Sequence, residues 1–168
     1  IGRESDGNAT PGSSYGLSIA NNTFLNANGK YLLFGLPSQN PATGLVTLDI
    51  PTTMNSRANR IWYLERTGSA TGTVNMSFDL TAMGISGTSI YNTCHLLYRS
   101  GTTGTFTILN SIQYSGATSV SFNGITAPTT GYYTIGFVGS FLNITKVDQV
   151  LSDPINLTTN PKRIPLAE

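Results

Sequence analysis

Residues 60–80 read RIWYLERTGSATGTVNMSFDL, and this stretch decides how the chain is interpreted. The part from 72 to 80 alternates apolar and polar residues, as does a strand with one buried face and one solvated face. Its apolar positions are Val74, Met76, Phe78 and Leu80. Residues 60–66 precede this part across a short glycine-containing loop, so we expect the two segments to pair as a hairpin.

The alternation also predicts which way each side chain of the stretch points. We expect Trp62 and Leu64 to share the buried face with Met76 and Phe78. A lone tryptophan at the centre of a strand is typical of a core anchor, and the alternative is a platform on which a sugar stacks. The outward positions are expected to be Ile61, Tyr63, Glu65, Asn75, Ser77 and Asp79.

Outward from this stretch, the same alternation recurs between clusters of Gly, Asn, Ser and Pro, and no segment has a sustained helical period. We predict strands near 15–20, 30–36, 44–50, 60–66, 72–80, 91–99, 104–110, 117–122, 131–139 and 141–147. In the segment 131–139, Tyr133, Ile135 and Phe137 should form a buried face. About ten short strands at this spacing predict an all-β fold, an antiparallel β-sandwich of jelly-roll or immunoglobulin-like type.

The length of 168 residues predicts one domain. We place the sandwich at 1–150, with 1–14 as a polar N-terminal arm. Residues 151–168 carry three prolines and no lasting alternation, and are expected to form a C-terminal edge strand followed by a linker tail.

Composition narrows the classes of function. Only 10% of the residues are charged and the net charge is +1, so the chain lacks the basic surface of a nucleic-acid-binding protein. No apolar run approaches the roughly 20 residues of a membrane span. A chain rich in Thr, Ser and Asn with one cysteine is typical of an extracellular bacterial β domain without disulfides. N-glycosylation sequons begin at Asn8, Asn21, Asn75, Asn143 and Asn156, and they are weak indications of a eukaryotic secretory origin.

Candidate catalytic groups are few. Cys94 and His95 are consecutive on a predicted strand, so their side chains should point to opposite faces and form no dyad. Glu65 and Asp79 are the one pair of acids that we place on a common face, and we expect them to be a solvated ladder rather than a glycosidase pair. Because no nucleophile or phosphate-binding motif is present, we expect a protein that is not an enzyme.

We expect no cofactor. One cysteine and one histidine are too few for a zinc site. Bound calcium is the alternative, and it would need an oxygen cluster of the kind that Glu4, Asp6 and Asn8 could supply. Asp148 and Asp153 make a weaker pair.

Tyrosines are the side chains best suited to contact a ligand, because an exposed ring can stack on a glycan or on a protein surface. The candidates for ligand or partner contacts are Tyr63, Tyr91, Tyr114 and Tyr132.

Four pieces occur in an order that resembles a known module: IGRESDG (1–7), NGKYLLFG (28–35), NRIWYLERTGSATGTVNMSFDL (59–80) and GYYTIG (131–136). The sequence is similar over about residues 1–139 to a β-rich module that follows concanavalin-like domains in surface proteins of flavobacteria and their relatives. The resemblance implies an extracellular, multidomain bacterial protein, exported by type IX secretion and linked to adhesion. It supplies no catalytic residues, and the segment after 139 departs from it.

Two roles compete on these grounds. In the first, the chain is a cell-surface adhesion module that recognises glycans or neighbouring domains. In the second, it is a structural subunit that joins other copies of itself into a filament or sheath. Assembly would add a strand from one copy to a sheet edge of the next, with residues 7–20 or 155–168 as the donor. The candidate inter-subunit strand residues are Ile155, Leu157, Ile164 and Leu166.

Overall fold

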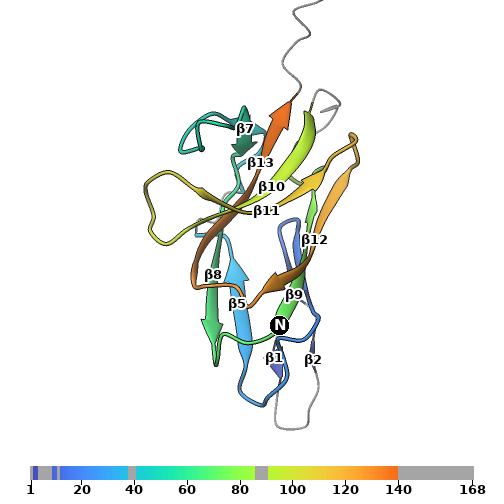
Figure 1. Ribbon diagram of the computed structural model, residues 1–168, viewed down its shortest axis with the longest axis vertical. Coiled ribbons are helices and arrows are strands. Elements are labelled where there is room, and N and C mark those ends of the chain that lie inside the picture. Colours follow the sequence, from blue (N-terminus) through green and yellow to red (C-terminus); the bar gives the residue numbers. More distant parts are fainter. Residues whose placement is uncertain (1, 4–8, 11, 38–40, 86–90, 140–168) are drawn as a thin grey trace, which may run out of the picture.

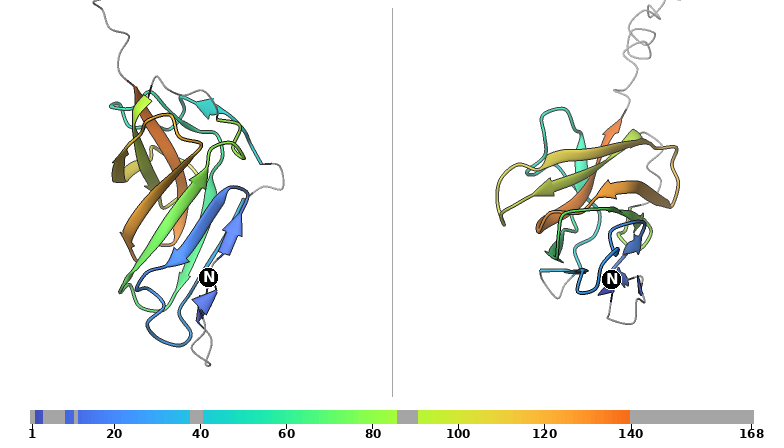
Figure 2. Two further views of the ribbon diagram at one scale, coloured as in Figure 1. Left: turned by 90° about the vertical axis from the view of Figure 1, so that its right-hand side faces the viewer. Right: turned by 60° about the horizontal axis from the view of Figure 1, so that its bottom comes forward.

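The computed structural model describes residues 2–3, 9–10, 12–37, 41–85 and 91–139. These residues form strands, turns and loops and contain no helix. Figure 1 shows the strands, and the turned views of Figure 2 separate them into two layers. The predicted all-β, antiparallel β-sandwich of about ten short strands is therefore confirmed.

The larger layer, sheet A, has nine of the described strands. Its order is β11 (Thr107–Gln113), β10 (Tyr91–Arg99), β13 (Gly131–Gly139), β8 (Trp62–Thr67), β5 (Tyr31–Gly35), β1 (Gly2–Arg3) and β2 (Ala9–Thr10). Two further strands join it beside β13, namely β7 (Ser56–Ala58) and β6 (Leu45–Val46). Sheet B runs in the order β12 (Ser119–Thr126), β9 (Thr73–Asp79), β4 (Leu17–Asn21) and β3 (Gly12–Ser14).

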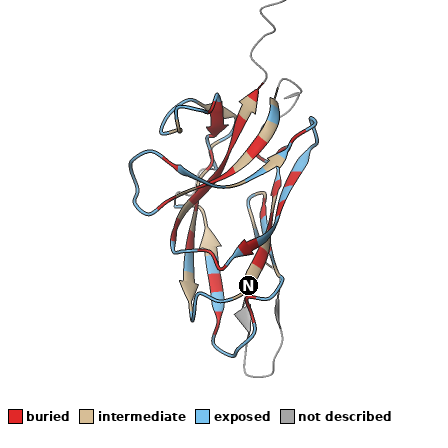
Figure 3. Cartoon of the chain, viewed as in Figure 1, coloured by how far each residue is buried: buried red, intermediate tan, exposed pale blue. Residues whose placement is uncertain are grey.

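The predicted alternation of buried and exposed side chains is confirmed in β9, where the sequence pattern is strongest. Val74, Met76 and Phe78 of β9 have no exposed surface, whereas Asn75, Ser77 and Asp79 face outward. The neighbouring β12 repeats the pattern, visible as alternating bands in Figure 3. Tyr133, Ile135 and Phe137 of β13 are fully buried, as expected. Sheet B thus buries one face and leaves the other in solvent, as the period of two requires.

The predicted hairpin between 60–66 and 72–80 is wrong. β8 pairs with β5 and β13 in sheet A, whereas β9 pairs with β4 and β12 in sheet B. The buried faces were predicted correctly, because Trp62 meets Phe78 across the sandwich with ring centroids 5.4 Å apart. Alternation identifies the face that a strand buries, but the same face can be buried against a strand of the opposite sheet.

Gly72 lies where the chain crosses from β8 to β9. Its φ is +87°, and a Cβ at this position would collide with the backbone of Thr23 and Phe24. That backbone is held close because the amides of Asn22, Thr23 and Phe24 all donate to the carbonyl of Thr73. Only glycine combines this backbone angle with such a close approach.

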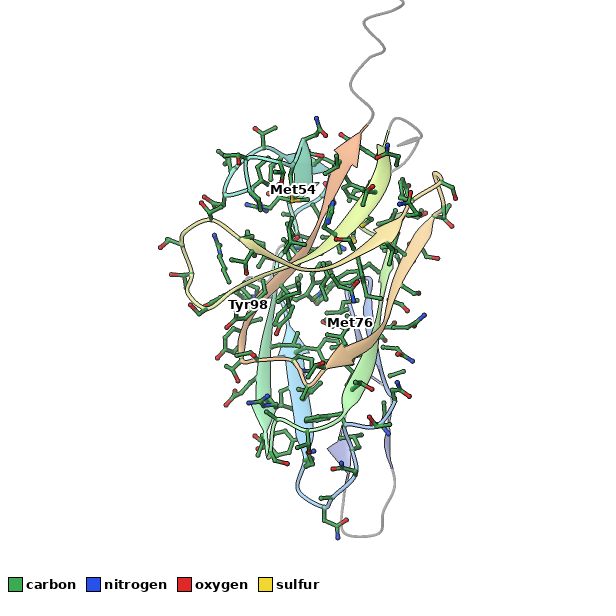
Figure 4. All side chains as sticks on the ribbon, viewed as in Figure 1. Met54, Met76 and Tyr98 are labelled. Carbon is green, nitrogen blue, oxygen red and sulfur yellow. The ribbon has the colours of Figure 1, made fainter. Side chains whose placement is uncertain are left out.

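Trp62 anchors the main core. It is fully buried, and its indole N–H donates to the carbonyl of Ser14 at 2.9 Å. A second, smaller core of Met54, Leu97 and Phe106 lies on the outer face of sheet A. Figure 4 labels Met76, which belongs to the main core, and Met54, which lies near β7 in the second. The second core covers part of the outer face of sheet A and leaves the part around β5 and β8 open.

Several predicted boundaries differ. The strand expected at 44–50 is only β6, because the chain turns at Asp49, whose φ is +57°. Residues 12–14 of the expected polar arm form β3, which pairs with β4 across a turn in which Tyr15 and Gly16 both have positive φ. That geometry is typical of a two-residue hairpin turn. The strand predicted at 141–147 lies outside the described residues.

Candidate functional site

The structure brings together two of the four candidate tyrosines. Tyr63 of β8 and Tyr132 of β13 are register partners, and their ring centroids lie 5.1 Å apart with planes tilted by 55°. Both rings are half-buried on the outer face of sheet A. The other two tyrosines pack against Phe137 of the main core: Tyr91 also accepts a hydrogen bond from Ser56 at 3.1 Å, and Tyr114 is only 7% exposed.

A hollow of about 430 Å³ opens beside this tyrosine pair. Three neighbouring strands form its floor. Gly35 and Leu33 of β5 lie opposite Tyr63 and Glu65 of β8, and Tyr63 in turn lies opposite Tyr132 of β13. Gly35 has no atom within 4 Å of the position that a Cβ would take, so the space beside Tyr63 is unfilled. The lining residues are Leu33, Phe34, Gly35, Leu36, Pro37, Tyr63, Glu65 and Tyr132. We call this the β5–β8–β13 hollow.

Among the described residues that line the hollow, Glu65 alone carries a charge. Its side chain is exposed, and the carboxylate makes no hydrogen bond or ion pair with any other described residue. The other two described acids have partners. Oδ2 of Asp49 lies 3.0 Å from the guanidinium nitrogen of Arg99, and Oδ1 of Asp79 accepts a hydrogen bond of 3.0 Å from the backbone N–H of Ala82. The hollow is thus an apolar, aromatic surface with one free carboxylate, a composition typical of small-ligand sites.

Two arginines pack on Phe106 of the second core, and one of them, Arg99, also lies near Tyr132. The guanidinium carbons of Arg57 and Arg99 lie 5.3 and 4.3 Å from the ring centre of Phe106, and Arg99 lies 6.0 Å from that of Tyr132. Arg99 donates to Asp49 and to the carbonyl of Gly104, although its buried Nε has no partner in the described structure. This packing orients Tyr132, and sequence reasoning missed it because nothing local marks an arginine as buried.

The Cys94 and His95 side chains diverge, as predicted. Cys94 is fully buried in the main core, and burial raises the pKa of its thiol, so it is no nucleophile. His95 points to the other face, where its Nδ1 lies 2.7 Å from Oγ of Ser111, and partial burial lowers its pKa. The register of β10 and β11 creates this His–Ser pair, and no described carboxylate hydrogen-bonds to His95 to orient it.

The expectation that Glu65 and Asp79 share a face is wrong. It followed from the hairpin that does not form, and the two acids belong to different sheets. Glu65 has the apolar Leu33 as its neighbour on β5, and Asp79 has Ser119 as its neighbour on β12. Glu65 points outward from sheet A and Asp79 points outward from sheet B, so the two carboxylates do not face one another across a common cleft.

Other candidate residues lie outside the described part of the chain. They are Glu4, Asp6, Asn8, Asp148, Asp153, Ile155, Leu157, Ile164 and Leu166. Within the described part, no three His, Cys, Asp or Glu side chains gather closely enough to hold a metal ion. No helix among the described residues has the length and hydropathy to cross a membrane.

Comparison with known proteins finds one family. The family model described as "Domain of unknown function (DUF8202)" matches residues 10–131. The matched range includes β5, β8 and the residues that follow β5. It therefore covers every lining residue of the β5–β8–β13 hollow except Tyr132, which lies one residue beyond the end of the match. No curated protein and no solved structure matches the chain.

Proposed function

Because the chain belongs to the DUF8202 family, whose description assigns no activity, we propose a function from its surface: it is a non-enzymatic module that binds glycans in the β5–β8–β13 hollow. The observation that carries the proposal is the tilted pair of Tyr63 and Tyr132 beside the space left by Gly35. We further propose that the module acts at an extracellular bacterial surface in adhesion. The low charge and the resemblance to flavobacterial surface modules support this setting.

The chemistry of the hollow suits a sugar. A tyrosine presents an apolar ring face together with a polar hydroxyl, which matches the apolar ring faces and polar rims of saccharides. Glu65 can accept hydrogen bonds from sugar hydroxyls, since a carboxylate is a pure acceptor with two oxygens. The hollow is open to solvent rather than enclosed, because its floor is the outer face of a sheet. An extended oligosaccharide is therefore a better fit than a compact metabolite.

Removing either ring should abolish most of the binding. We expect Tyr63→Ala and Tyr132→Ala each to weaken binding at least about tenfold, because a central aromatic contact typically contributes more than about 1.4 kcal/mol. A glycan array would identify the tightest oligosaccharide, and calorimetry would then measure its Kd for each variant.

The matched control is Tyr15→Ala, which removes a tyrosine that is 57% exposed on the β3–β4 turn, away from the hollow. Its Kd should equal that of the unmodified chain. Equal loss of affinity in all three variants, or an array without any bound glycan, would contradict the proposal.

A second candidate function is self-assembly by strand addition, and the β11 edge favours it. Among the described strands β11 pairs only with β10, and its sequence TILNSIQ contains no charge and no proline. Ile108 and Leu109 on it are 41% and 47% exposed. Natural edge strands usually carry charges or prolines that prevent pairing with another chain, so an unprotected edge is suited to accept a strand.

The remaining described edges are less suited. β2 and β6 have two residues each, β3 has three, and the pairing of β12 is irregular between Phe122 and Ile125. A hollow of about 340 Å³ borders β11 and β12, where Leu109 and Ile125 could receive a donor side chain. Residues 12–14 and 17–21 already pair within sheet B, so the donor proposed here is the segment 155–168 of another copy.

A charge on this edge should stop assembly. We expect Leu109→Lys, and equally a chain that ends at residue 154, to remain monomeric under conditions in which the unmodified chain forms filaments, because a lysine opposes strand pairing. Light scattering and negative-stain microscopy would measure the state. Leu48→Lys is the control, since Leu48 is 67% exposed but lies outside β11. An unmodified chain that stays monomeric would exclude this second function.

A further inference from the structure

We propose that the β5–β8–β13 hollow prefers glycans that carry a free, cationic amine, such as glucosamine units, and that Glu65 is the residue that selects them. This inference rests on the proposed glycan-binding function and goes one step further, because it states the charge of the ligand. It follows from the balance of charges in and around the hollow and from the two tyrosine rings.

Glu65 differs from the other described acids because its carboxylate makes no hydrogen bond or ion pair with a described residue. The chain has only eight acidic residues, and of the three described ones Glu65 alone has no partner within the described structure. Within the described residues, no cation pairs with this carboxylate at the edge of the apolar hollow. An ammonium group on a ligand would supply that cation and would donate hydrogen bonds to the carboxylate oxygens.

The cations near the hollow do not offset this charge. Arg99 is paired with Asp49 behind Tyr132, and Arg66 donates to the carbonyl of Ala127 at 3.3 Å. Neither is among the lining residues. A sulfated or uronic-acid glycan would therefore approach a carboxylate with no compensating cation in the lining, and this repulsion selects against acidic ligands.

The two tyrosines add a second attraction for a cation. Tyr63 and Tyr132 are tilted by 55°, so their faces do not cover each other as parallel rings would. An ammonium placed near an aromatic face is attracted by the negative charge density of the ring. N-acetylation of the sugar removes this positive charge, as acetylation of lysine does, and leaves the apolar contact intact.

The experiment compares ligands of one chain length that differ in charge and in the substituent that sets it. The probes are glucosamine oligomers, N-acetylglucosamine oligomers, neutral glucose oligomers and an acidic glycan, measured by calorimetry at low and at high salt. We expect the glucosamine oligomer to bind about fivefold to tenfold more tightly than the neutral ones, as an exposed charge pair plus a cation–π contact would give. Added salt should reduce this preference.

Glu65→Gln should bind the amine oligomer no more tightly than the uncharged oligomers, so the preference for the amine is lost, whereas Tyr132→Ala should lose affinity for every probe. Asp79→Asn, an acid of the other sheet, is the control and should keep the preference.

Equal binding of amine and N-acetyl forms would overturn this inference while the glycan-binding function stood. A preference that persists in Glu65→Gln would overturn the role of Glu65. An absence of binding to every probe would overturn both proposals.

Discussion

Trp62→Ala is expected to lower the free energy of unfolding by about 3–5 kcal/mol, the range measured when a large aromatic side chain is removed from a core. Trp62 is fully buried, contacts Phe78 edge to face across the two sheets, and donates to the carbonyl of Ser14. Alanine would leave a large cavity at the junction of both layers. Since a domain typically has about 5–15 kcal/mol of stability, this loss is a large fraction of the total.

Denaturant unfolding followed by circular dichroism would measure the change, because Trp62 is the only tryptophan and the variant has no indole fluorescence. The control is Tyr63→Ala on the neighbouring, outward position, which should cost no more than about 1.5 kcal/mol, the upper value for an aromatic pair. Trp62→Phe should fall between the two. A Trp62→Ala chain as stable as Tyr63→Ala would contradict the assignment of Trp62 as the core anchor.

Arg60→Met is expected to cost about 3 kcal/mol, because Arg60 joins three separate loops through one buried guanidinium group. It is 4% exposed, and it donates to the carbonyls of Ala42, Tyr15 and Ala82 at 3.0, 2.8 and 2.9 Å. Methionine retains most of the aliphatic volume but leaves these three bonds unmade. Burial lowers the pKa of Arg60, and the carbonyl oxygens offset the cost of holding its charge away from water.

Thermal and denaturant unfolding would measure this loss, and amide exchange would locate it in the turns at 15–16 and 80–85. Arg66→Met is the matched control, because Arg66 is only half-buried and its guanidinium makes one long bond of 3.3 Å to Ala127. It should cost less than about 1 kcal/mol. Equal effects of the two substitutions would mean that Arg60 is an ordinary surface cation and would refute its linking role.

Much of the architecture could be read from the order of residues. The alternation of Val74, Met76 and Phe78 predicted a strand with one buried face, and the same reasoning placed Tyr133 and Trp62 in the core. Cys94 and His95 point to opposite faces, as neighbours on any strand must. These predictions succeeded because the period of two is a local property of an extended backbone.

The candidate site could be predicted only in part. The outward positions of Tyr63 and Glu65 followed from the alternation, but nothing in the sequence placed Tyr132 beside Tyr63 or opened a space at Gly35. Tyr114 was an equal candidate until the fold buried it against Phe137. A tyrosine suits a core and a binding surface equally well, so its chemistry alone does not decide between them.

The sequence by itself determined that this protein is an all-β domain of low charge, and which face of each strong strand is buried. Only the tertiary structure decided that β8 and β9 lie in different sheets, and hence that Glu65 belongs with Tyr63 and Tyr132 rather than with Asp79. The physical reason is that the face a strand buries depends on which of its side chains are apolar, and the sequence gives this directly. Strand pairing depends on backbone N–H and carbonyl groups, which are the same in every residue except proline, which has no N–H. Which strand pairs with which is therefore decided by contacts between residues distant in the chain.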